Sequence, residues 1–364
     1  MNNVVNEAPK ISGHRRPSSD ETKPTLLGEA RTLLKVNIRE YGMYIALFVI
    51  IVIFSIMTDG LFMSSRNISN LLDATGYTAV LAVGMTLVIV IRHIDLSVGF
   101  AAGFMGAIAA ILMTQAGIPF YVTIPIILVL GIVIGMFNGV LVASVGIPSF
   151  VSSLAAMLIF RGALLQVTEK TGTINVPSDH FNAIGNGYVP GITEVGGLKL
   201  LSLILGLVAI LLYIYFEFKN RTNKQKYNFE VVSKGMFTLK LVFVSAIIAY
   251  VTWILSGYNG FSWTVIIVLG VVLIYHFLTT KTVLGRHIYA VGSNPEAAHL
   301  SGINVKKITY IVFGSMGLLS ALSGILYTAR LQSASTTAGT LFELDAIAAA
   351  YVGGVSAAGG VGKV

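Results

Sequence analysis

The sequence lacks cysteine and has few charged residues. With no cysteine among its 364 residues, it can form no disulfide, thiolate metal site or iron–sulfur cluster. Asp, Glu, Lys and Arg make up 11% of the chain, whereas a soluble globular domain carries roughly 25%. Hydrophobic residues account for 55%, and the mean hydropathy is +0.82. Because so little charge cannot cover a soluble surface, the composition indicates a membrane protein.

Long uncharged runs predict the membrane spans. A bilayer core about 30 Å thick needs roughly 20 apolar helical residues to cross it. The run from Leu96 to Phe160 contains no Asp, Glu, Lys, Arg or His, and Gly-Ile-Pro breaks at 117–119 and 146–148 divide it into three spans. The whole chain thus predicts an all-α polytopic transmembrane bundle of nine spans, near 41–57, 74–91, 96–116, 120–145, 149–167, 200–216, 241–255, 263–278 and 308–329.

The positive charges predict the orientation of these spans. Most of the 24 Lys and Arg residues fall inside if the N terminus is cytoplasmic, as expected for cytoplasmic loops. The net charge of +8 is therefore a topology signal and gives no reason to invoke nucleic acid. We expect a largely disordered, basic cytoplasmic arm at 1–40 and a transmembrane domain at 41–364, with a periplasmic loop at 168–197 and cytoplasmic loops at 217–237 and 279–307.

The last of these loops is predicted to contain a short helix. The segment Ser293-Asn294-Pro295-Glu296 is typical of a helix start, because it offers a capping residue, a proline in the first turn and an acid that complements the helix dipole. Gly302 is a typical stop signal. Such a helix could fit the groove of a cytoplasmic partner, or it could be a connector on the membrane surface that binds nothing.

Polar residues near the apolar runs are candidates for a transport path, because burying them in hydrocarbon is expensive. Asp95 lies in a polar break between two spans, although a simple tight turn explains the neighbouring Ser and Gly equally well. Asn138, Arg161, Glu343 and Asp345 belong to the same class. Glycines repeat at every fourth position from Gly131 to Gly139, which favours close helix packing over a hinge.

No catalytic motif is present in the sequence. The six histidines show no metal-ligand spacing. The final GGVGKV resembles a phosphate-binding loop, but Ala357 stands where that motif requires glycine and Val364 where it requires a hydroxyl. We therefore expect that this chain is not an enzyme, does not hydrolyse ATP and carries no cofactor of its own.

Several motifs follow one another in order from about residue 62 to the end. They are Ile94 to Gly99 (IDLSVG), Asn138-Gly139, Gly146 to Phe150 (GIPSF), Phe160 to Gly162 (FRG), the segment from Gly285 to Ile303, and Glu343 to Ala349 (ELDAIAA). Together they resemble the ribose/xylose-type permease family of bacterial ABC importers, and within it the xylose and multiple-sugar permeases.

This resemblance implies an inner-membrane permease subunit that imports a xylose-like aldose. The implied partners are a second permease copy, a cytoplasmic ATP-binding subunit that binds the ATP, a periplasmic sugar-binding protein and membrane lipid. Glu296, Ala297, Ala298 and Gly302 match the EAA-x3-G pattern that contacts the ATPase, but residues 311–313 lack the proline that follows in that pattern. The implied coupling residues are Arg286, Asn294, Glu296, Ala297, Ala298 and Gly302, and the implied path residues are Asp95, Ser97, Asn138 and Asp345.

The family pattern and the acids near the predicted spans leave more than one function open. Family members continue with roughly two further spans, so the resemblance implies a C-terminally truncated chain that ends at the outer face or in a re-entrant dip. A proton- or cation-coupled secondary transporter would instead use Asp95 or Asp345 to bind its coupling ion. An ABC permease for branched-chain amino acids and a nontransporting membrane anchor also stay open.

Overall fold

The computed structural model is predominantly α-helical. It describes residues 38–169, 172–190, 194–195, 198–227, 231 and 233–364, so nearly all of the predicted arm at 1–40 lies outside the described residues. The helices are α2 (Ile38–Met57), η1 (Leu61–Met63), α3 (Ser65–Val90), α4 (Val98–Thr114), α5 (Phe120–Val140) with the π-helical turn η2 (Leu141–Val145), α6 (Ser149–Thr168), α7 (Asp179–Asn186), α8 (Leu200–Lys226), α9 (Lys234–Ser256), α10 (Trp263–Lys281), α11 (Val283–Ser293), α12 (Pro295–Leu300), α13 (Val305–Leu331) and α14 (Phe342–Val352).

Seven helices are long and apolar enough to cross a membrane: α3, α5 extended by η2, α6, α8, α9, α10 and α13. The other two predicted spans correspond to shorter apolar helices, Ala46–Met57 within α2 and Val98–Thr114. The structure therefore confirms an all-α polytopic bundle. The count of nine spans and the cytoplasmic N terminus stay predictions.

The predicted helix breaks occur where expected. Gly117 and Gly146 have positive φ angles of 65° and 84°, and Pro119 and Pro148 then start α5 and α6. The predicted start of the second span at residue 74 was wrong, because α3 already begins at Ser65. Asp73 is tolerated inside α3 because its carboxylate accepts a hydrogen bond from Ser262, the N-cap residue of α10.

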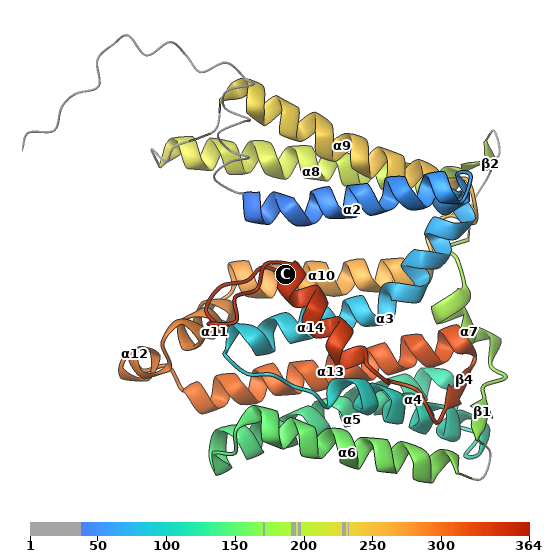
Figure 1. Ribbon diagram of the computed structural model, residues 1–364, viewed down its shortest axis with the longest axis vertical. Helices are drawn as coiled ribbons and strands as arrows, with labels where there is room; N and C mark the ends of the chain where they lie inside the picture. Colours follow the sequence, from blue (N-terminus) through green and yellow to red (C-terminus); the bar gives the residue numbers. More distant parts are fainter. Residues whose placement is uncertain (1–37, 170–171, 191–193, 196–197, 228–230, 232) are drawn as a thin grey trace, which may run out of the picture.

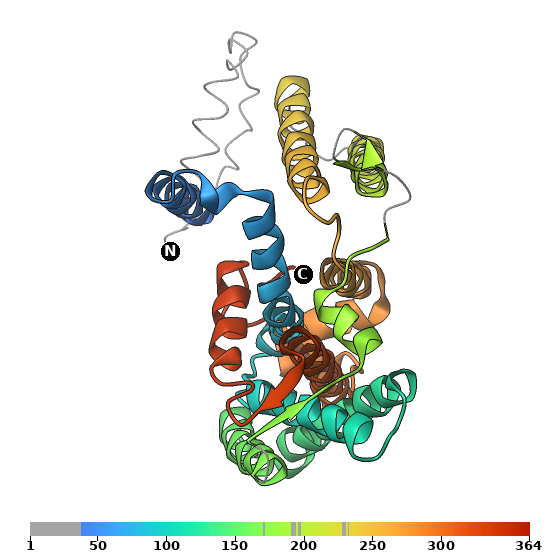
Figure 2. The same cartoon turned by 90° about the vertical axis from the view of Figure 1, so that its right-hand side faces the viewer.

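The helices differ in how deeply they are buried. Helix α13 lies in the middle of the group formed by α3, α4, α5 and α14, while α2, α8 and α9 lie beside this group (Figure 1). Figure 2, which looks along the helices, shows the same separation end-on. Buried residues cover most of α13 and α3 but little of α8. The exposed apolar side chains of α8 suit contact with lipid, which solvates them as well as protein would.

Small residues allow the closest helix contact. A Cβ added to Gly131 would meet the Gly317 carbonyl oxygen, and one added to Gly135 would meet the Phe313 carbonyl oxygen and the Gly317 Cα. Helices α5 and α13 therefore cross with their backbones in contact. This confirms the close-packing interpretation of the repeated glycines.

The two ends of the bundle carry different connections (Figure 1). One end, called the α7 end, holds α7 together with the antiparallel pair β1 (Thr173–Asn175) and β4 (Ser333–Ser335). The opposite end, called the α12 end, holds α11 and α12. The predicted loop at 217–237 is shorter than expected, because α8 continues to Lys226 and α9 begins at Lys234. A second short pair, β2 (Glu194–Val195) and β3 (Leu198–Lys199), precedes α8.

The segment after α13 differs from the expected course. Helix α14 is a short helix beside α3, as in a re-entrant segment, but the residues after it continue to the α12 end. There the Gly360 amide donates to the Val90 carbonyl at 2.8 Å, and the Tyr289 hydroxyl donates to the Gly362 carbonyl at 2.6 Å. These bonds hold the residues after α14 against the ends of α3 and α11.

Candidate functional site

The polar break between α3 and α4 is the first part of the candidate site. Helix α3 ends at Val90, and α4 starts after Ser97. The intervening backbone turns sharply, since Arg92 has a φ angle of 64°, a left-handed conformation that is uncommon for residues other than glycine. Such a break frees backbone groups that must find partners away from water.

Three of the four predicted path residues form one buried hydrogen-bonded network. The Asp95 Oδ1 accepts bonds from the Ser97 amide at 2.9 Å and the Ser97 hydroxyl at 2.6 Å. The Asn138 Nδ2 donates to the Ser97 Oγ at 3.1 Å, and the Ser152 hydroxyl donates to the Asn138 Oδ1 at 3.3 Å. All four side chains are at most 5% exposed. The network joins α4, α5 and α6 at the break.

The fourth predicted path residue lies elsewhere. Asp345 is on the exposed side of α14, and its neighbour Glu343 is the buried carboxylate of that helix. The Glu343 side chain packs against Gly99 in the first turn of α4, and its Oε2 has no hydrogen-bond partner among the described residues. The structure therefore brings Asp95, Ser97 and Asn138 together but does not join Asp345 to them.

The predicted coupling helix is present at the α12 end. The Asn294 Oδ1 accepts hydrogen bonds from the amides of Glu296 and Ala297 at 3.0 and 3.1 Å, which caps the helix as predicted. Gly302 has a φ angle of 83° and ends the turn that follows. Of the implied coupling residues, Ala298 is buried, and the exposed ones are Arg286, Asn294, Glu296, Ala297 and Gly302.

The surface around α12 suits contact with another protein. Leu300 at the end of α12 is 86% exposed, more than any other large apolar residue whose burial the structure describes. Two hollows of about 580 and 270 Å³ flank the helix, and both are lined by Ala143, Val305 and Lys306. A protruding helix with adjacent hollows provides the shape complementarity that a docking surface needs.

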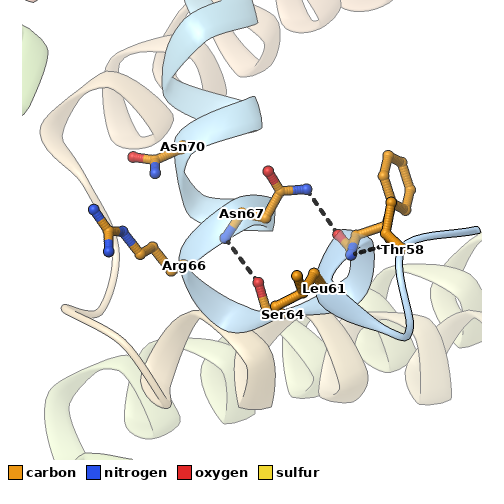
Figure 3. Close-up of a pocket in the computed structure, with 7 residues that line it drawn as sticks. Thr58, Leu61, Ser64, Arg66, Asn67 and Asn70 are labelled. Carbon is orange, nitrogen blue, oxygen red and sulfur yellow. Dashed lines mark hydrogen bonds between the residues drawn. The ribbon is translucent and has the colours of Figure 1, made fainter. Parts of the chain in front are cut away.

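The α7 end has a polar hollow of its own. It has a volume of about 350 Å³ and lies where α2 and η1 meet α3. Figure 3 shows Asn67 bonded to its neighbours: its amide donates to the Ser64 Oγ at 3.3 Å and its Nδ2 donates to the Phe62 carbonyl at 2.8 Å. Arg66 and Asn70 extend along the other side of this hollow.

Sequence reasoning missed several long-range contacts of polar residues. Besides the Asp73–Ser262 pair, the Arg330 guanidinium donates to the Asn186 Oδ1 at 3.0 Å, and the Asn186 Nδ2 donates to the Ala329 carbonyl at 2.7 Å. These bonds join α7 to the end of α13. Asp73 was visible as an acid close to an apolar run, but no local pattern pairs residues so far apart.

The chain matches a protein-family model described as "Branched-chain amino acid transport system / permease component" over residues 67–216 and 191–362. It is 41% identical to the xylose transport system permease protein XylH of Haemophilus influenzae over 91% of this chain and 86% of that protein. The XylH of Escherichia coli K12 is 38% identical, covering 91% of this chain and 82% of that protein. The chain belongs to this permease family.

A further member of the family is the ribose import permease protein RbsC of Haemophilus influenzae. It is 35% identical over 89% of this chain and 80% of that protein. No solved structure matches the chain. As a member of the family, the chain is a multi-pass inner-membrane transport permease and not an enzyme, which confirms the resemblance inferred from the motifs.

Proposed function

We propose that this permease imports a xylose-like aldose and is driven by a separate cytoplasmic ATPase. A periplasmic sugar-binding protein delivers the sugar, and a second copy of the permease completes the translocation path. Two relatives are named for xylose and one for ribose, which supports a monosaccharide. In this proposal the α12 end faces the cytoplasm and the α7 end faces the periplasm, in agreement with the charge distribution.

The observation that carries the proposal is the exposed, capped helix α12. A helix this short does not form without its surroundings. In this chain Asn294 caps it with two hydrogen bonds, and Leu300 at its end is 86% exposed. A secondary transporter has no need of a protruding helix at this end. A partner that contributes a groove for α12 would cover this tip.

The test is a charge reversal on α12. We expect Glu296→Lys to abolish co-purification of the ATPase subunit from the native membrane, because the exposed Glu296 carboxylate would face the partner and lies at the start of the helix, where an acid is favoured. Membrane insertion and thermal stability should match those of the wild type, since the side chain is exposed.

The matched control is Asp179→Lys, which makes the same charge reversal at an exposed acid in the first turn of α7, at the α7 end. It should leave ATPase recovery unchanged. Full ATPase recovery with Glu296→Lys would contradict the assignment of α12 as the coupling helix. Identification of the sugar-binding protein that co-purifies with the wild type would decide which sugar is transported. If a branched-chain amino-acid binding protein co-purifies instead, the substrate is an amino acid and not a sugar.

A further inference from the structure

Arg92 contacts the segment that leads into α12, although about 200 positions of sequence separate them. Its Nε donates to the Gly292 carbonyl at 2.6 Å, and its Nη2 donates to the Ser293 carbonyl. These are the last carbonyls of α11, where no further helical amide is available to bond them and where the helix dipole favours a cation. The next residue, Asn294, is the cap of α12.

Three segments of the chain meet next to Arg92, which is itself exposed. A Cβ at Gly359 would meet the Arg92 Cγ, and a Cβ at Gly292 would meet the Val90 carbonyl. The amide of Gly360 donates to that same carbonyl at 2.8 Å. The Tyr289 hydroxyl donates to the Gly362 carbonyl at 2.6 Å. The end of α3, the end of α11 and the tail after α14 therefore pack against one another at the Val90 carbonyl, and Arg92 lies exposed beside them.

The main chain after Arg92 leads directly to the buried polar network. The amides of Arg92 and His93 bond back to the carbonyls of Ile89 and Val88 at 2.9 and 3.0 Å. The amide of Ile94 donates to the Ser149 Oγ at 3.3 Å, and Asp95 is the next residue. Hydrogen bonds therefore tie His93 to α3 and Ile94 to α6 along the short segment that leads from the guanidinium contact to the network.

We propose that Arg92 is a positioning residue that transmits the movement of α12 to the break between α3 and α4. When the ATPase shifts α12, the guanidinium moves with the two α11 carbonyls and displaces the segment that carries Asp95. The network with Ser97 and Asn138 then changes its geometry inside the membrane. This inference rests on the proposed function, because it requires an ATPase that acts on α12.

The test compares Arg92→Gln with Arg92→Lys in the purified complex of the permease with the ATPase and sugar-binding subunits that co-purify with it. The complex is reconstituted into liposomes, and xylose uptake and ATP hydrolysis are measured together. Glutamine removes the cation, whereas lysine keeps it but cannot form the same pair of bonds. Lys281→Gln, which removes an exposed cation at the end of α10, is the matched control.

We expect Arg92→Gln to retain the ATPase subunit but to lower xylose transported per ATP hydrolysed by about tenfold, which corresponds to about 1.4 kcal/mol. Arg92→Lys should recover part of this ratio, and Lys281→Gln should equal the wild type. A purely structural role would lower uptake and hydrolysis together and leave their ratio unchanged.

Two results would overturn the inference. One is a wild-type transport ratio in Arg92→Gln. The other is loss of the ATPase subunit from both Arg92 variants, which would mean that Arg92 only maintains the folded shape of α12. If the wild-type complex itself contains no ATPase, the proposed function fails, so the two failures are distinguishable.

Discussion

Substitution of Gly135 by alanine is predicted to destabilise the permease by forcing α5 away from α13. The added methyl would meet the Phe313 carbonyl oxygen and, at 2.9 Å, the Gly317 Cα and amide nitrogen. All of these atoms belong to the backbone of α13 and cannot rotate aside. The two helices must therefore separate, and the contacts along the rest of their interface weaken.

The magnitude follows from two opposing effects. Overpacking a tight site costs about 1–3 kcal/mol, while alanine is favoured over glycine within a helix by about 1 kcal/mol. Where the methyl meets only backbone, the upper part of the overpacking range applies, so the net loss is about 1–2 kcal/mol. For a soluble domain of 150–250 residues, each kcal/mol corresponds to about 2–4 °C in melting temperature.

The assay is thermal unfolding of the purified permease in detergent. The fraction that stays folded after heating at each temperature is measured by size-exclusion chromatography. The matched control is Gly270→Ala on α10, where an added Cβ would find no atom within 4 Å. Gly135→Ala should melt several degrees below the wild type, and Gly270→Ala should melt at or above it. Equal melting temperatures for the two variants would refute the close contact between the α5 and α13 backbones.

Two further predictions concern the polar network and the cap of α12. Asn138→Ala leaves the buried Ser97 and Ser152 hydroxyls without a shared partner, so it should destabilise the purified permease by about 1–3 kcal/mol; an unchanged melting temperature would contradict the network. Asn294→Ala removes an N-cap worth about 1 kcal/mol and should weaken ATPase binding about fivefold in a titration, whereas Asn294→Asp keeps the cap and should bind normally. Equal binding by both Asn294 variants would show that the cap has no part in docking.

Local patterns predicted most of the long helices and the α12 motif, but neither α7 nor α14. Apolar runs and Gly-Ile-Pro breaks indicated where helices lie, because length and hydropathy determine what can cross a bilayer. The cap, proline and glycine of 294–302 predicted α12, because capping depends on residues three or four positions apart. The glycine repeat likewise predicted close packing on one helix face.

The contacts that assemble the candidate site depend on residues distant in sequence. Asp95 and Asn138 were singled out one by one, but the role of Ser152 in joining them emerges only when α5 and α6 are packed. Nothing near Arg92 in the sequence indicates a bond to Gly292. The sequence also does not show whether Glu343 or Asp345 is the buried acid, because this depends on how α14 packs against α4.

The most direct test of the account is the energy source of transport. The permease and its co-purifying subunits are placed in liposomes, and uptake of labelled xylose is measured with ATP alone and with a proton gradient alone. The account predicts uptake that requires ATP and the sugar-binding protein and that survives an uncoupler. Uptake that proceeds without ATP and collapses with the uncoupler would contradict it and favour the secondary transporter.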